Sequence, residues 1–337
     1  MKAATGEPLA DTEAWFLQHG LPYFVPEERH AARSGLRLGR TVPLVLLIGL
    51  AAAGAGYALA LVSDEFSFAP ATLVTLGLVA ALWYALTALR ARPILTWALH
   101  RTFGSLRTLL PMMSRALPLL LLFVTFLFIN AEVWEVAAGL DGGELWLVAL
   151  LFGVLAGGFL LVRLPEEVDR TDDHVDEALL LSACKGTPLE ERSRELVEDP
   201  DADPAAYAEV TGFERWNLVL VLLVIQAAQV LLLACSVFLF FLLFGAMVME
   251  PDIVRGWTGG TPHHLPGLSN VSVELVQVSV FLASFSSLYL TVSTVTDETY
   301  RAQFFGSVVD EMERAVGVRA VYLALRAKNA DPSETAR

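Results

Sequence analysis

Long runs of apolar residues, each free of charged side chains, alternate with polar segments along the chain. Six such windows stand out, and most reach the roughly 20 residues with which an α-helix crosses a hydrocarbon layer about 30 Å thick. The pattern therefore predicts an all-α, polytopic helical membrane protein with six transmembrane helices. The windows run from Val42 to Val62, Ala71 to Leu89, Ala116 to Ala131, Leu145 to Val162, Trp216 to Met249, and Leu275 to Thr296.

Two of the windows depart from the expected length. The third has only 16 residues, and we expect residues 109–118 to complete it, with Arg115 reaching toward the lipid headgroups. The fifth has 34 residues, which corresponds to ~50 Å of helix at ~1.5 Å per residue. Dividing the fifth window would leave no connecting loop and would move the basic C-terminus across the membrane. We therefore predict one tilted helix that protrudes from the bilayer.

The basic residues of the chain gather on one side of the predicted spans. Of 23 Lys and Arg residues, only Arg255 falls in a segment on the other side, and the successive segments hold 5, 0, 5, 0, 6, 1 and 6 of them. Anionic lipids and the membrane potential hold basic loops in the cytoplasm. The sequence therefore predicts a multi-pass protein of a bacterial plasma (inner) membrane with both termini in the cytoplasm.

This topology divides the chain into five regions, three of which are cytoplasmic. The N-terminal region, the loop before the fifth span and the C-terminal region together predict a small helical module beside the membrane. The regions are a cytoplasmic N-terminal segment (1–41), spans one to four (42–163), a cytoplasmic helical loop (164–215), spans five and six (216–296), and a cytoplasmic amphipathic C-terminal helix (297–337).

Each cytoplasmic region carries its own helix signals. Asp11 is expected to cap a helix that ends at Gly20, and the apolar stretch 21–26 should rest on either the membrane surface or the other cytoplasmic pieces. Thr187 begins a capping-box pattern for a helix that ends at Val197. Apolar residues spaced by four predict an amphipathic C-terminal helix. This stripe consists of Tyr300, Phe304, Val308, Met312 and Val316.

The last two windows carry polar residues at helical spacing. At ~100° per residue, the polar residues of the sixth span lie within about a third of its circumference, and we predict that they meet those of the fifth span in a polar seam. Serines on the opposite side predict that the sixth span lies in the middle of the bundle. The seam residues are Gln226, Gln229 and Ser236 on the fifth span, and Gln277, Ser284, Ser287 and Thr291 on the sixth.

The polar seam has two interpretations. Amide and hydroxyl groups that face each other in hydrocarbon can hold helices together through interhelical hydrogen bonds. The same groups can instead line a hydrated path or a binding site for a small solute. The glycines of the fourth span, Gly153 and Gly157, form a GxxxG pattern that permits close backbone approach. We expect these two glycines to support packing within the chain rather than dimerisation, and the oligomeric state stays open.

Several chemistries have no residues to carry them. No window contains Asp, Glu, Lys, Arg or His, so the spans lack the groups of a proton relay, an ion-pair gate or a voltage sensor. The chain has no P-loop, HExxH, GxSxG or CxxC motif, and we expect no catalytic residue, cofactor, metal site or nucleic-acid partner. The sequence favours a non-enzymatic scaffold or accessory subunit in the lipid bilayer, with a cytoplasmic or membrane protein as partner. The alternative is a channel or transporter for a neutral or cationic small solute along the polar seam.

Two stretches resemble a known group of proteins. RALPLLLLFVTFLFINAEVWE, from Arg115 to Glu135, and RLPEEVDR, from Arg163 to Arg170, are similar to sequence in uncharacterised integral membrane proteins of high-GC actinobacteria. The resemblance implies a polytopic membrane protein of a bacterium. It implies no activity, cofactor or functional residue.

Overall fold

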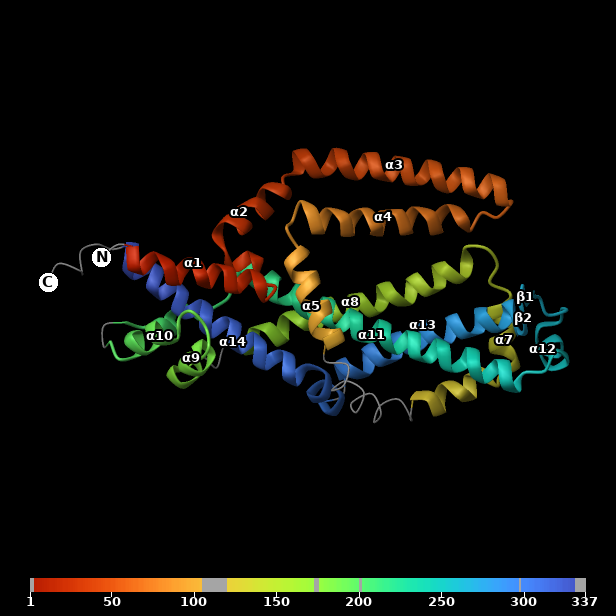
Figure 1. Ribbon diagram of the computed structural model, residues 1–337. Coiled ribbons are helices and arrows are strands. Elements are labelled where there is room, and N and C mark those ends of the chain that lie inside the picture. The colour runs from red at the N-terminus through yellow and green to blue at the C-terminus, as the bar shows by residue number, and fades with distance from the viewer. Residues whose placement is uncertain (1–2, 105–119, 173–175, 200–201, 297, 331–337) are drawn as a thin grey trace.

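The computed structural model describes residues 3–104, 120–172, 176–199, 202–296 and 298–330, and it confirms an all-α polytopic helical membrane protein (Figure 1). Within these ranges, five helices are long and apolar enough to cross a membrane, and the number rises to six if one bent pair forms a single span. The five helices are α3 (Leu38–Ser63), α4 (Phe68–Thr87), α8 (Glu144–Asp172), α11 (Gly212–Val248) and α13 (Val273–Thr296).

The third predicted span is not one straight helix. A helix covers Leu120–Phe128, and α7 (Ala131–Ala138) follows at an angle of 76°. Asn130 caps α7, because its side-chain oxygen accepts hydrogen bonds from the backbone N–H groups of Glu132 at 2.8 Å and Val133 at 3.4 Å. The predicted window is therefore corrected to a helix that ends at Phe128, and the predicted extension over 109–118 lies outside the described residues.

The fifth predicted span is confirmed as one continuous helix. Helix α11 contains 37 residues, so it is ~55 Å long at ~1.5 Å per residue. This length exceeds the ~30 Å of a hydrocarbon layer. One end of α11 must therefore extend beyond the bilayer.

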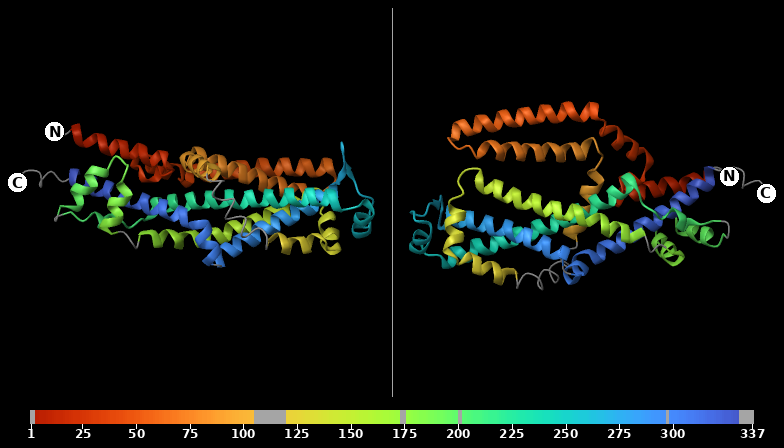
Figure 2. Two further views of the ribbon diagram at one scale, coloured as in Figure 1. Left: turned by 60° about the horizontal axis from the view of Figure 1, so that its bottom comes forward. Right: turned by 180° about the vertical axis from the view of Figure 1, so that it is seen from behind.

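The connections between the spans alternate between two ends of an elongated bundle (Figures 1 and 2). One end holds α7, α12 (Pro251–Thr258) and a two-stranded antiparallel hairpin. The other end holds the beginning of α1 and the end of α14, together with the helices between α8 and α11. The hairpin consists of β1 (His264–Leu265) and β2 (Leu268–Ser272), and the helices of the second end are α1 (Ala3–Gln18), α2 (Pro26–Gly35), α9 (Glu177–Cys184), α10 (Glu190–Val197) and α14 (Glu298–Ala330).

The helices at the second end form a packed module. The module also includes two 3₁₀ turns, η1 (Pro22–Phe24) and η2 (Pro204–Tyr207). Its buried apolar side chains form one continuous core with those between the spans. Phe16 of α1 lies edge-on to Phe24 and to Tyr322 of α14, with ring centroids 5.4 and 5.5 Å apart. The apolar stretch 21–26 therefore rests on the other module elements.

Two helix boundaries in the module differ from the prediction. Helix α1 already begins at Ala3, so Asp11 lies inside the helix and does not cap it. Helix α10 begins at Glu190, later than the capping-box pattern predicts. The Thr187 hydroxyl accepts a hydrogen bond from the N–H of Leu189 at 3.3 Å, while the Glu190 carboxylate accepts one from the N–H of Gly186 at 2.8 Å. The predicted capping residues therefore stabilise the turn that precedes the helix.

Helices α11 and α13 form the centre of the bundle. The apolar window of α13 is 44% buried and that of α11 is 22% buried, against 6–11% in α3, α4 and α8. Helix α13 packs against α11, α8 and α7, while α5 (Arg92–Gly104) crosses α11 near the module. Helix α13, the last span, thus lies in the middle of the bundle, as the polar residues on two of its sides predict.

Candidate functional site

A close contact at Gly245 relates α11 to α13. A Cβ atom placed there would lie 2.2 Å from Cδ1 of Leu275, so the leucine side chain would have to shift if another residue replaced the glycine. The two helices run in opposite directions (Figure 1), and each rises ~1.5 Å per residue. Counting away from this contact brings Gln229 to the level of Thr291, whereas Ser284 lies ~15 Å from the level of Gln226.

The hydroxyl groups of the polar seam bond to their own helices. On α13, Ser284 donates to the Val280 carbonyl at 2.8 Å and Ser287 to the Ala283 carbonyl at 2.9 Å. Thr291 and Ser236 donate in the same way to carbonyls four residues earlier, each at 2.8 Å. Such local bonds satisfy the hydroxyl donors. Gln277 instead leaves its helix and donates to the Leu140 carbonyl at 3.1 Å.

The two glutamines of α11 are the exceptional polar groups of the seam. Their side chains are 2% exposed at Gln226 and 8% at Gln229. Nε2 of Gln226 and Oε1 of Gln229 have no hydrogen-bond partner among the described residues, and the same holds for the buried hydroxyl of Ser279. An unpaired buried polar group costs about 1–3 kcal/mol. The seam therefore contains buried polar atoms that packing alone does not explain.

Close backbone approaches involve other glycines than those of the GxxxG pattern. A Cβ built on Gly153 or Gly157 meets nothing within 4 Å in the described part of the chain. A Cβ at Gly56 would lie 2.6 Å from the Ala69 carbonyl, and one at Gly143 would lie 2.6 Å from the Ser67 carbonyl. The close backbone packing expected of the GxxxG pattern is therefore found at Gly56 and Gly143 instead.

A second candidate site lies where the module meets α11. The Glu214 carboxylate is buried and receives Arg29 Nη1 at 2.5 Å and Arg319 Nε at 2.8 Å. Nη2 of Arg319 binds the same carboxylate, while its Nη1 donates to the carbonyls of Tyr207 at 2.8 Å and Glu209 at 3.2 Å. This arrangement uses every nitrogen of the Arg319 guanidinium. The buried ion cluster, which we define as Arg29, Glu214 and Arg319, joins α2, α11 and α14.

Asn217 holds the N-terminal segment beside the ion cluster. It is fully buried, and its side chain accepts a hydrogen bond from the N–H of Tyr23 at 2.8 Å and donates one to the Gly20 carbonyl at 2.9 Å. Burial raises the pKa of Tyr23 to about 12, so its hydroxyl stays protonated and donates to the Leu89 carbonyl at 2.7 Å. One turn of α11 thus fixes the segment that leads from α1 to the first span.

Sequence reasoning missed this second site. Glu214 and Asn217 stand at the edge of an apolar run, where polar residues are ordinary. Arg319 gives a usable signal, because it follows Val316 by three residues and lies on the apolar side of the C-terminal stripe. A charged residue on a buried helix face requires a buried counter-charge. The sequence does not indicate that this counter-charge is Glu214.

Cys184 provides a test that the module is folded. Its side chain is fully buried at the end of α9, and burial raises the pKa of the Cys184 thiol to about 11. Because the thiolate is the reactive form, we expect maleimide to label native Cys184 far more slowly at pH 8 than the denatured chain, in a Cys235→Ser background. The native rate should increase up to about pH 11. Equal native and denatured rates at pH 8 would contradict the buried position.

No family model, curated protein or solved structure matches this chain. The fold and the two sites define an all-α polytopic membrane protein that carries a helical module at one end of its bundle. Within the described residues, no group of three or more His, Cys, Asp or Glu side chains is placed to hold a metal ion. The module and the seam are therefore the parts of the molecule that bear on its function.

Proposed function

We propose that the protein is a non-enzymatic scaffold or accessory subunit in the plasma membrane of a bacterium, and that its module binds a protein partner in the cytoplasm. The observation that carries this proposal is the buried ion cluster. It connects α2, α14 and the membrane-spanning α11 through one carboxylate. A module held in this way keeps a fixed orientation to the bilayer, which is what a scaffold requires.

The orientation rests on the distribution of charge. Among the residues that the structure describes, 18 of the 19 Lys and Arg residues lie in the segments that join the spans at the module end of the bundle. Basic loops are retained in the cytoplasm during membrane insertion. The end with α7, α12 and the β-hairpin carries only Arg255, which supports placing that end outside.

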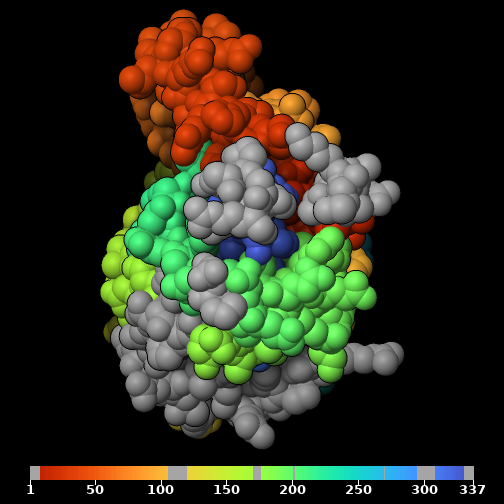
Figure 3. All heavy atoms as spheres, turned by 90° about the vertical axis from the view of Figure 1, so that its left-hand side faces the viewer, coloured from red at the N-terminus to blue at the C-terminus, as the bar shows by residue number. Residues whose placement is uncertain are grey.

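The module also indicates the chemistry of its partner. Residues 176–209 contain ten acidic and three basic residues. The helices of this segment, α9 and α10, face the viewer at the module end of the molecule (Figure 3). An acidic surface repels anionic lipid headgroups and nucleic acid, and it attracts a basic protein surface. The proposed partner is therefore a protein that presents Lys and Arg residues.

Thiol labelling in intact cells tests the orientation. In a variant without native cysteines, a cysteine replacing the exposed Gly260 should react with an impermeant maleimide. Cysteines replacing Ser34 and Ser182, which are exposed at the module end, should react only after lysis. Labelling of Ser182→Cys in intact cells would reverse the topology and refute the cytoplasmic module.

Charge reversal tests the partner surface. We expect Glu191→Lys with Glu198→Lys, two exposed positions of the module, to reduce the amount of a stoichiometric partner that cross-links and co-purifies at least tenfold. The matched control, Glu135→Lys with Glu250→Lys, makes the same charge change at exposed positions of the opposite end. Equal loss in the control pair, or the absence of a stoichiometric partner, would contradict the scaffold.

A second candidate function is passage of a small solute along the polar seam. It is favoured by the unpaired amide atoms of Gln226 and Gln229, since a hydrated path would satisfy them. Purified protein in liposomes would then show saturable flux that Gln226→Leu abolishes. Ser236→Ala is the control, because Ser236, although predicted as part of the seam, is exposed rather than buried with the two glutamines, and its hydroxyl bonds to its own helix. Such flux would replace the scaffold by a transporter or channel.

A further inference from the structure

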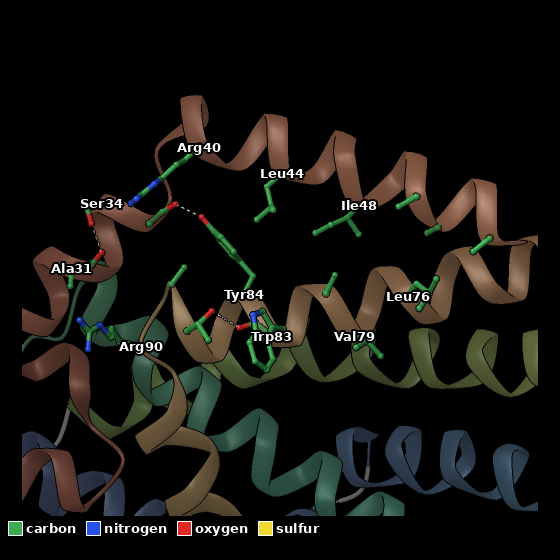
Figure 4. A pocket seen from close by; sticks show the side chains of 17 residues that line it. Ala31, Ser34, Arg40, Leu44, Ile48, Leu76, Val79, Trp83, Tyr84 and Arg90 are labelled. Atoms are coloured by element: carbon green, nitrogen blue, oxygen red, sulfur yellow. Dashed lines mark hydrogen bonds between the residues drawn. The ribbon is translucent and has the colours of Figure 1, made fainter.

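An open groove runs between α3 and α4 and ends at α2 (Figure 4). Its volume is about 1120 Å³. Small side chains, including Ala52, Ala55 and Ala80, hollow the walls, and Leu44, Ile48 and Val79 supply branched apolar surface. A surface of this kind fits a flexible hydrocarbon chain.

The end of the groove beside α2 is polar and positively charged. Arg40, in the first turns of α3, extends toward Ser34, while Arg90, just after α4, lies beside Ala31 (Figure 4). The Arg90 side chain is 58% exposed, and its Nε lies 3.9 Å from the Glu28 carboxylate. This loose pair does not engage the terminal nitrogens of the guanidinium. Two arginines, one on each side of α2, thus line the same end of an apolar groove.

The backbone at Arg90 supports a specific role for this residue. Its φ is 55°, in the left-handed region that side chains other than Asn, Asp and Gly rarely adopt. Such strain persists where the surrounding structure requires it, and it concentrates at ligand-binding positions. Tyr84 closes the same end by donating to the Gly35 carbonyl at 2.5 Å. The strained turn brings Arg90 to the edge of the groove.

The groove has the length of one lipid leaflet. From Arg40 to Ala55 the helix rises ~22 Å at ~1.5 Å per residue. Half a bilayer, headgroups included, measures about 20–22 Å. Trp83 lines the polar end and is 68% exposed, as is typical of aromatic residues at headgroup depth. A lipid whose acyl chain fills the groove would therefore have its phosphate at the level of the arginines.

We propose that this groove binds one anionic phospholipid of the cytoplasmic leaflet. Its phosphate lies between the guanidinium groups of Arg40 and Arg90, which donate charge-assisted hydrogen bonds, and one acyl chain follows the alanine-lined wall. The positive charge at one end distinguishes this occupant from an apolar helix of a second copy. The inference goes beyond the proposed function, and only the assignment to the cytoplasmic leaflet rests on the proposed orientation.

Native mass spectrometry of the full chain tests the lipid site. After release from nanodiscs of equal phosphatidylglycerol and phosphatidylcholine, the protein should retain one phosphatidylglycerol. Arg40→Ala with Arg90→Ala should reduce this occupancy at least tenfold, and so should Ala55→Phe, which fills the groove. The control, Arg37→Ala with Arg92→Ala, makes the same charge change at exposed positions that do not line the groove and should retain the lipid.

The remaining outcomes overturn the proposal. Equal loss in both arginine pairs would show general attraction of lipid by positive charge. Equal retention of phosphatidylcholine would show an unselective apolar surface, and a lipid-free dimer cross-linked through Ala55→Cys would identify a second copy as the occupant. Gel filtration of each variant establishes that it is folded. If Ala55→Phe fails to fold, the arginine pair and its control still decide the question.

Discussion

Glu214→Ala is expected to lower the free energy of unfolding of the helical module by about 3–5 kcal/mol, the range found when one partner of a buried ion pair is removed. Glu214 is 4% exposed and Arg319 is 6% exposed. Without the carboxylate, the only hydrogen bonds that Arg319 keeps are those to the carbonyls of Tyr207 and Glu209. The guanidinium groups of Arg319 and Arg29 then have no negative charge between them.

The rate at which Cys184 reacts measures this loss. In a Cys235→Ser background, opening of the module exposes the buried thiol, so a change of about 3–5 kcal/mol increases the labelling rate from about a hundredfold to a few thousandfold. Glu195→Ala is the control, because its surface pair with Arg192 contributes below about 1 kcal/mol. Replacing both Glu214 and Arg319 by leucine should recover much of the stability. A labelling rate for Glu214→Ala equal to that of Glu195→Ala would refute the role of the cluster.

The sequence predicts the spans well because hydrocarbon imposes one simple requirement on a crossing helix. Backbone groups must bond within the segment, so length and apolar composition suffice. The third window shows the limit of this reasoning. Asn130 followed by Ala131 and Glu132 is a helix-start signal, yet it stands inside an apolar run that continues without charge. Across the bend, the indole N–H of Trp134 donates a hydrogen bond to the Phe128 carbonyl. Composition alone does not reveal this hydrogen bond.

The candidate site was predictable in part. Polar residues at helical spacing predict a polar seam between α11 and α13, but a single sequence does not give the register between two helices. In the structure Leu275 packs against Gly245, and counting from this contact brings Gln229 level with Thr291. The ion cluster was beyond prediction for a related reason. Its members are separated by 185 and 105 residues along the chain, and only the folded module brings them together.

Trp134→Ala should have the second large effect, a loss of about 3–5 kcal/mol. Trp134 is fully buried in α7 and lies edge-on to Phe128 and Trp257, with ring centroids 5.5 and 5.8 Å apart. Its indole N–H donates to the Phe128 carbonyl at 2.6 Å. This carbonyl ends the helix before the bend, where the backbone has no further helical partner. Alanine therefore leaves a cavity and an unpaired carbonyl together.

Graded substitutions separate these two contributions. Trp134→Phe keeps most of the packing and loses the hydrogen bond, so we expect about 1–3 kcal/mol, measured by unfolding in mixed detergent and denaturing micelles. Trp146→Phe is the matched control, because Trp146 is 49% exposed and its indole donates to Thr75 at 2.7 Å. Since Trp134 lies at the end opposite the module, Cys184 should label at the wild-type rate in all three variants. Faster labelling in Trp134→Ala would mean that the two ends unfold as one unit, and a loss below about 1 kcal/mol would show that the bend does not depend on Trp134.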